Sequence, residues 1–198
     1  MIEPATATKP KRASALPPDE RRSMIVAATL PLLLEHGDRV TSKQIAEAAG
    51  IAEGTIFRAF ADKDEVIAAV IEAGLDPAPM EAALSSQLDG LAFEDAVAKA
   101  IEILQRRVID VWRLVSSVGA KYQDNTRRPM SDSAALIRMF EGHRAHISVE
   151  PKVAARLLRA LTLSTTHPML AGAPMSAREV FELFVHGVGA YGAGGTAC

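Results

Sequence analysis

Cysteine is almost absent from this sequence of 198 residues, because the only one is Cys198 at the last position. A single cysteine excludes an internal disulfide framework and is typical of a reducing compartment. No run of about 18 uncharged apolar residues is present, so no membrane-spanning helix is expected. The N-terminus lacks the apolar segment of a secretory signal. These absences predict a cytoplasmic protein without a membrane span.

Strand-like patterns are also missing. Apolar and polar residues do not alternate along the chain, and aromatic residues make up only 5% of it. Apolar residues instead recur at helical spacing, which favours an all-α protein. With 48% hydrophobic residues, the chain can bury a substantial core, either as one compact body or as a small domain fused to a larger one.

An excess of positive charge is the third absence. The formal net charge is -2, whereas domains that bind nucleic acids are often strongly basic. Between residues 37 and 63 the two signs balance, since Arg39, Lys43, Arg58 and Lys63 are matched by Asp38, Glu47, Glu53 and Asp62. A nucleic-acid-binding function must therefore rest on sequence pattern and not on bulk charge.

The chain divides into four predicted segments. Residues 1–18 form a proline-rich basic arm, and 192–198 a disordered tail. Residues 19–76 form one helical domain and 77–191 a second, with the boundary at Pro77 and Pro79. The expected helices are 19–36, 42–49, 53–59, 62–74, 93–118, 132–146, 151–166 and 176–190. Pro31 lies inside the first of them and either kinks it or marks a restart.

The segment from Thr41 to Phe60 has the pattern of a helix-turn-helix. Thr41 can cap the first helix while Gln44, three residues on, bonds back to it. A turn at Gly50 then leads directly into a second short helix. The apolar positions that hold the pair together are Ile45, Ala46, Ala49, Ile51, Ile56 and Phe60.

Over about residues 21–71 the sequence resembles the tetracycline-repressor family of regulators. The matching positions are Thr41, Ile45, Ala46, Ala49, Gly50, Gly54, Thr55, Phe57, Phe60 and Lys63. Beyond residue 77 the resemblance is limited to general helical features. It implies an all-α fold in which an N-terminal three-helix helix-turn-helix domain binds DNA, and a C-terminal helical domain binds a ligand and dimerises.

The resemblance also implies a set of DNA contacts, with Arg58 as the residue for base readout. The expected DNA-binding residues are Thr41, Ser42, Lys43, Gln44, Glu53, Gly54, Thr55, Phe57, Arg58 and Lys63. Two positions depart from the family pattern. Phe57 replaces a common tyrosine and has no hydroxyl for a phosphate, and Ala52 replaces a common serine cap. Glu53 also adds negative charge near the groove.

For the second domain, the resemblance implies an apolar effector cavity and a dimer built from the last two helices. The expected ligand-binding residues are Trp112, Arg113, Tyr122, Met139, Phe140, His143 and His167. On their spacing alone, the apolar members Trp112, Tyr122, Met139 and Phe140 are typical of a plain core. Arg113, His143 and His167 are each typical of a surface residue or a satisfied core residue. The expected interface or core residues of the helices at 151–166 and 176–190 are Val153, Leu157, Leu158, Leu161, Phe181, Phe184 and Val188.

Other functions find little support in the residues. His143 and His146 share a helix face, but no third metal ligand is evident, so no metal is expected. The glycines at 187, 189 and 192 follow a helix instead of a strand, which excludes a dinucleotide site. No nucleophile, phosphate loop or cofactor motif predicts an enzyme. The main alternative is a helical small-molecule-binding or enzymatic domain with a vestigial DNA-binding hairpin.

Overall fold

The computed structural model describes residues 17–122 and 131–187, and within these ranges it consists of helices without a strand. The all-α prediction is therefore confirmed. Most of the expected basic arm, the tail at 192–198 and Val188 lie outside the described residues. Within the described part no helix is both long enough and apolar enough to cross a membrane.

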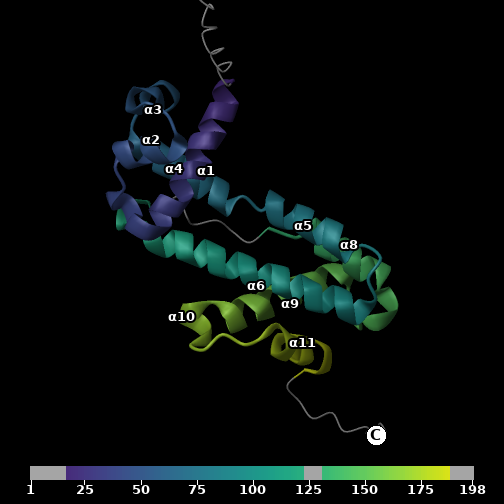
Figure 1. Ribbon diagram of the computed structural model, residues 1–198. Helices are drawn as coiled ribbons and strands as arrows, with labels where there is room; N and C mark the ends of the chain where they lie inside the picture. Colours follow the sequence, from purple (N-terminus) through teal and green to yellow (C-terminus); the bar gives the residue numbers. More distant parts are fainter. Residues whose placement is uncertain (1–16, 123–130, 188–198) are drawn as a thin grey trace, which may run out of the picture.

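The N-terminal helices form a compact group around α1, which both α2 and α4 contact (Figure 1). They share a set of buried side chains, here called the N-terminal cluster, which includes Ile25, Leu33, Ile45, Ile56 and Phe60. The helices in this group are α1 (Pro18–His36), η1 (Gly37–Arg39), α2 (Ser42–Ala49), α3 (Glu53–Ala59) and α4 (Lys63–Leu75).

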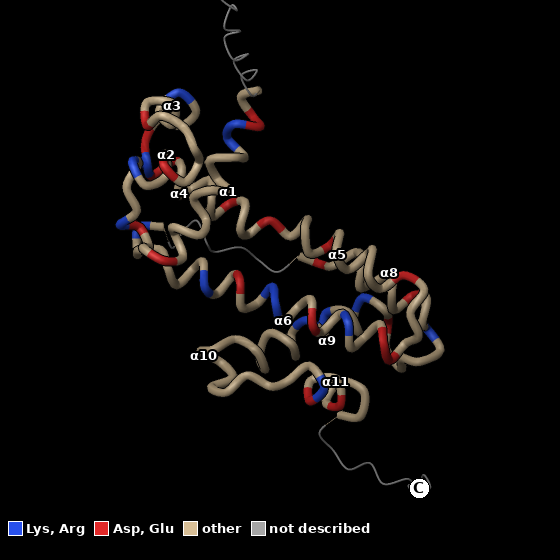
Figure 2. Tube along the Cα trace, in the orientation of Figure 1, with Lys and Arg blue, Asp and Glu red and all other residues tan. Residues whose placement is uncertain are grey.

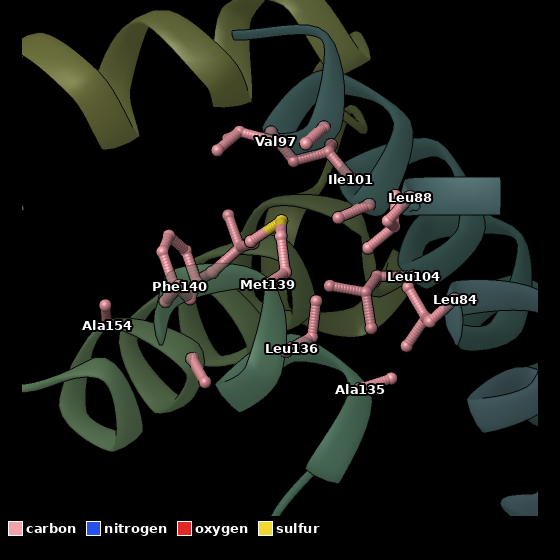
Figure 3. Packing of buried hydrophobic residues seen from close by; sticks show 14 of the residues in the cluster. Leu84, Leu88, Val97, Ile101, Leu104, Ala135, Leu136, Met139, Phe140 and Ala154 are labelled. Atoms are coloured by element: carbon pink, nitrogen blue, oxygen red, sulfur yellow. The ribbon is translucent and has the colours of Figure 1, made fainter. Parts of the chain in front are cut away.

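A second group of helices packs around a separate set of buried residues, the C-terminal cluster, which includes Leu84, Ile101, Leu136, Phe140 and Leu158. Side chains from α5, α6, α8 and α9 turn toward one common interior (Figure 3). The elements beyond α4 are α5 (Ala78–Leu88), α6 (Phe93–Ser117), η2 (Ala120–Tyr122), α8 (Ala134–Gly142), η3 (Arg144–His146), α9 (Pro151–Thr166), α10 (Pro168–Ala171) and α11 (Ala177–His186).

Helix α6 belongs to both clusters. Its 25 residues rise about 37 Å at 1.5 Å per residue. Val97 and Ile101 near its start lie in the C-terminal cluster, while Leu114 near its end lies in the N-terminal cluster. Helix α6 contacts α1 and α4 of the first group of helices, and also α5, α9 and α11 of the second group. The predicted division of the chain at 76 and 77 stays a prediction.

Most of the expected helices are present. The bounds of α2, α3 and α9 are those expected, and α1 continues through Pro31 without ending or restarting there. Two expectations were wrong. No helix was expected between 77 and 92, where α5 lies with Pro79 in its first turn, a position that tolerates proline. The helix expected at 132–146 ends at Gly142 and is followed by the separate turn η3.

Candidate DNA-binding surface

Helix α2 begins with a capping box, as its sequence predicted. The backbone N–H of Gln44 donates to Thr41 Oγ1 over 3.2 Å, and Gln44 Oε1 accepts from the Thr41 backbone N–H over 2.9 Å. Thr41 Oγ1 also donates to the same Gln44 oxygen. Because these bonds occupy the cap, the backbone N–H groups of Ser42 and Lys43 are the first-turn donors left for an anion.

The turn between α2 and α3 depends on Gly50. This residue has φ 66° and ψ 32°, a left-handed conformation that glycine adopts without a Cβ penalty. The backbone N–H of Ile51 then donates to the carbonyl of Ala46 over 3.0 Å and closes the turn. Helix α3 starts directly afterwards at Glu53. Ala52 precedes it without a side-chain cap, as expected from the replaced serine.

Packing of α3 divides its side chains into two faces. Ile56 is fully buried, and Phe60, just after the helix, is nearly so. On the other face Glu53, Gly54 and Arg58 are exposed, and Phe57 keeps 50% of its surface in solvent. Thr55 is half-buried. An exposed aromatic ring next to an exposed arginine on a short, firmly packed helix is the geometry of a helix that can enter a major groove.

The charge on this surface is mixed. Lysine and arginine occur beside aspartate and glutamate in the region of α2 and α3 (Figure 2). Lys43 and Arg58 are exposed, and so are Glu47 and Glu53. The structure thus keeps the charge balance of the sequence, and phosphate attraction here depends on individual residues and not on a continuous basic patch.

Arg22 of α1 is a structural residue of this surface that the sequence analysis did not identify. Its guanidinium donates to the carbonyl of Ala59, at the end of α3, and to Glu65 Oε1 over 2.9 Å. It also lies 4.0 Å from the ring centroid of Phe60. Glu65 accepts a further bond from the Ala61 backbone N–H, and these two bonds lower the pKa of its carboxyl. Arg22 therefore fixes the end of α3 on α1 and α4.

Lys63, expected to contact DNA, is half-buried and bonded within the chain. Its Nζ donates to the backbone carbonyl of Asp38 over 2.8 Å and connects the start of α4 with η1. Asp62 caps α4 by accepting from the Glu65 N–H, while the Glu65 side chain bonds to the backbone N–H of Ala61 and does not complete a capping box. The DNA contact of Lys63 stays a prediction.

The turn η2, just after α6, contacts the base of the helix-turn-helix. Tyr122 donates its hydroxyl to Asp64 Oδ1 over 2.7 Å, and Lys121 Nζ donates to the same oxygen over 2.9 Å. These two bonds, that of Tyr122 first, lower the pKa of Asp64. Nearby, Gly119 lies so close to Asp38 that an added Cβ would stand 2.4 Å from its carboxylate. The segment that follows α6 is thus joined to α4 by polar bonds and to η1 by close packing.

Replacing Tyr122 with phenylalanine tests the bond to Asp64. We expect the pKa of Asp64 to rise toward its ordinary value of about 4, because the main hydrogen bond to its charged form is lost. A carboxyl with a depressed pKa stabilises the fold above that ordinary value and loses the effect as the pH falls through its folded pKa. The stability difference between the two proteins should therefore shrink in acid. An NMR titration that gives the same Asp64 pKa in both would contradict this assignment.

The expected ligand-binding residues are not brought together. Met139 and Phe140 lie in the C-terminal cluster, whereas Tyr122 is buried in the N-terminal cluster. Arg113 is exposed on α6 and Trp112 is half-buried beside it, while His167 caps α10 by accepting from the Met169 N–H. Met139 and His143 line a common hollow. It measures about 320 Å³ and lies between α5 and α8.

His143 and His146 gather around one aromatic ring. Phe93 stacks on His146 at a centroid distance of 4.8 Å and meets His143 edge-on at 5.7 Å. In the described part of the chain no three histidine, cysteine or acidic residues are grouped so that they could hold a metal ion.

The expected interface residues differ in how accessible they are. Val153 and Leu157 on α9 are 42% and 52% exposed, and Leu158 is fully buried in the C-terminal cluster of its own chain. Leu161, Phe181 and Phe184 are half-buried. The ring of Phe184 contacts that of Phe140 at a centroid distance of 5.9 Å. The exposed surface of α9 thus carries the apolar side chains of Val153 and Leu157 beside Lys152 and Arg156. Helix α10 adds Met169 and Leu170, which are 83% and 64% exposed.

Comparison with known proteins supports the pattern found in the N-terminal helices. Residues 25–70, which cover most of α1, all of α2 and α3 and the first part of α4, match the family described as bacterial regulatory proteins, tetR family. The resemblance recognised in the sequence is thereby confirmed for this region. No curated protein matches the sequence.

Solved structures share the fold over most of the chain. A transcriptional regulator of the TetR/AcrR family from Thermobifida fusca has a TM-score of 0.57 and 19% identity, covering 85% of this chain and 98% of that one. FadR from Bacillus subtilis, in complex with stearoyl-CoA, has a TM-score of 0.50 and 15% identity over 84% and 99%. The superantigen PfiT has a TM-score of 0.56 and 19% identity over 86% and 97%.

Proposed function

We propose that this chain, which carries the N-terminal region of tetR-family regulatory proteins, is a cytoplasmic repressor that binds a near-palindromic operator as a homodimer. The observation that carries the proposal is the exposed face of α3, where Gly54, Phe57 and Arg58 stand on a helix held by the Gly50 turn and by Arg22. This face enters the major groove.

Within that groove Arg58 reads sequence, because its guanidinium can donate to both acceptors of a guanine edge. Phe57 supplies apolar contact, and Thr55, half-buried on the same helix, contacts the DNA backbone. The start of α2, with Thr41, Ser42 and Lys43, faces a phosphate through backbone N–H groups and the lysine side chain. Since basic residues are few, we expect weaker phosphate binding than a strongly basic domain provides.

Dimerisation places two copies of α3 on one face of the DNA. Val153 and Leu157 on α9 are the exposed apolar residues available for a two-fold contact, together with α11. A two-fold dimer would present its recognition helices roughly 34–36 Å apart, which suits two half-sites one helical turn apart.

Release from DNA is proposed to follow from a small apolar effector bound between residues 77 and 150. The hollow lined by Met139 and His143 is one opening that the structure offers in this region. Helix α6 runs from the C-terminal cluster to the N-terminal cluster, and η2, just after it, is bonded to α4 through Tyr122 and Asp64. A shift of α6 would therefore reach the helix-turn-helix. Such an effect is a coupling free energy between the two sites. DNA binding that no apolar compound alters would refute release by an effector.

The DNA-binding proposal is tested by Arg58→Ala. Sites selected from a random DNA library by the wild-type chain should be symmetric, and the variant should bind them roughly tenfold to hundredfold more weakly, since a bidentate guanine contact contributes about 1–3 kcal/mol. Arg106→Ala removes an equally exposed arginine from α6 and should leave affinity unchanged. If the wild-type chain selects no sequence at low salt, the proposal fails.

The alternative is a helical binding domain whose N-terminal hairpin no longer contacts DNA. The balanced charge around α2 and α3 favours it, as does the fact that the fold is also that of a protein called a superantigen. The same selection experiment separates the two functions, because a vestigial hairpin enriches no sequence. Activation instead of repression would use the same DNA contacts and differs only in the expression of a neighbouring gene.

A further inference from the structure

A long groove runs along the seam between α1 and α4 and continues to α6. It consists of two hollows, of about 420 and 360 Å³, that share Leu30, Ala73 and Gly74. The first extends from there to Arg22, and the second extends to Arg113. We call the two together the α1–α4 groove.

The floor of the groove is apolar. Val26 and Leu30 of α1 face Ala69 and Ala73 of α4 across it, and Leu34, at the α6 end, is 44% exposed. The small residue Ala73 keeps the groove open, because a larger side chain there would fill the part that the two hollows share. An open apolar channel of this kind suits a slim hydrocarbon or aryl group.

Charge is placed at the ends of the groove and not along it. At one end lies Arg22, whose guanidinium already donates to the carbonyl of Ala59 and to the carboxylate of Glu65. At the other end lie Arg107, Asp110 and Arg113. This second end has a net positive charge, and Arg113 is an exposed side chain that can move toward a ligand.

Arg107, at the same end, is bonded to the backbone and is not free to pair with a ligand. Its guanidinium donates to the carbonyls of Gly74 and Asp76, over 2.7 and 3.1 Å, and holds the end of α4 against α6. The two arginines therefore have different roles. Arg107 holds the backbone at the end of the groove in place, and Arg113 is available to pair with an anionic group.

We propose that the α1–α4 groove binds an amphipathic organic anion, with its apolar tail along Val26, Leu30 and Ala73 and its anionic head at Arg113. From Val26 to Leu34 helix α1 rises about 12 Å, which accommodates a tail of medium length. This site is separate from the hollow between α5 and α8. It does not disturb the closely packed C-terminal cluster (Figure 3), and it does not depend on DNA binding.

The proposal is tested by calorimetric titration of the full chain with decanoate and with decyltrimethylammonium, which have similar tails and opposite charges. We expect decanoate to bind and the cation to bind more weakly. Ala73→Leu should weaken decanoate binding at least about tenfold by filling the shared part of the groove. Arg113→Gln should weaken it about twofold to fivefold, as expected for one exposed charge pair.

Matched controls locate the effect. Ala82→Leu on α5 and Arg106→Gln on α6 make the same chemical changes at exposed positions outside the groove and should leave decanoate binding unchanged. If Ala73→Leu does not fold, Ala27→Leu narrows the groove from its other wall. The proposal is overturned if decanoate does not bind, if it binds equally well after Ala73 is enlarged, or if the cation binds as tightly. It is also overturned if Ala73→Leu instead dissociates a dimer, which would make a second copy of the chain the occupant.

Discussion

Replacing Phe140 with alanine should lower the free energy of unfolding by about 3–5 kcal/mol. Phe140 on α8 is fully buried, and its ring contacts that of Phe184 on α11. Truncation would leave a cavity between these helices and remove an aromatic contact, and the surrounding C-terminal cluster can close over it only in part. Chemical denaturation of the two proteins measures the difference.

Phe57→Ala is the matched control, because it is the same substitution at a half-exposed position. Phe57 lies on the solvent face of α3 with 50% of its surface exposed, so its removal should lower stability by only about 1–1.5 kcal/mol, about half of what full burial of a phenylalanine contributes. If Phe57 contacts DNA as proposed, this variant loses affinity for a selected operator while Phe140→Ala loses stability. Equal stability losses in the two variants would contradict the burial difference.

Gly37→Ala is expected to destabilise the chain by about 3 kcal/mol or more. Gly37 has φ 62° and ψ -151°, a region that residues with a Cβ occupy at a cost of about 1–3 kcal/mol. In addition, the new Cβ would stand 2.7 Å from the backbone carbonyl oxygen of Ser117, at the end of α6. Because that neighbour is backbone, the contact can be relieved only by moving η1 away from α6.

Gly50→Ala separates the backbone effect from the steric one. Gly50 also has a positive φ, of 66°, but nothing lies within 4 Å of the position its Cβ would take. Its substitution should therefore cost only about 1–2 kcal/mol, the price of the left-handed conformation alone. Thermal unfolding measures the stability of both variants. If Gly37→Ala loses no more stability than Gly50→Ala, then η1 can move away from α6 at little energetic cost.

The helix-turn-helix could be predicted closely because its limits are set by local chemistry. Thr41 and Gln44 specify the start of α2 through a capping box, and Gly50 specifies its end through a positive φ. The same reasoning located α9, which begins at Pro151. It failed for α5, because Pro77 and Pro79 were interpreted as marking a boundary, whereas a proline in the first turn begins a helix as readily as it breaks one.

Contacts between distant residues could not be predicted in this way. Arg22 and Glu65 are 43 positions apart, and no local pattern indicates that α1 holds the end of α3. The expected ligand-binding residues show the same limit. Helical spacing correctly indicated that Met139 and Phe140 are buried, but it cannot tell which buried or exposed residues meet in one cavity, and Tyr122 proved to belong to the other cluster.

The position of α6 in both clusters has a consequence for hydrogen exchange. A buried backbone amide exchanges its hydrogen when the cooperative unit that contains it opens. In a helix shared by two units, each amide therefore exchanges with the unit against which it packs. Exchange near Val97 and Ile101 should therefore report opening of the C-terminal cluster, and exchange near Leu114 opening of the N-terminal cluster. A single helix would then record, along its own length, whether the two halves of the molecule open together or one before the other.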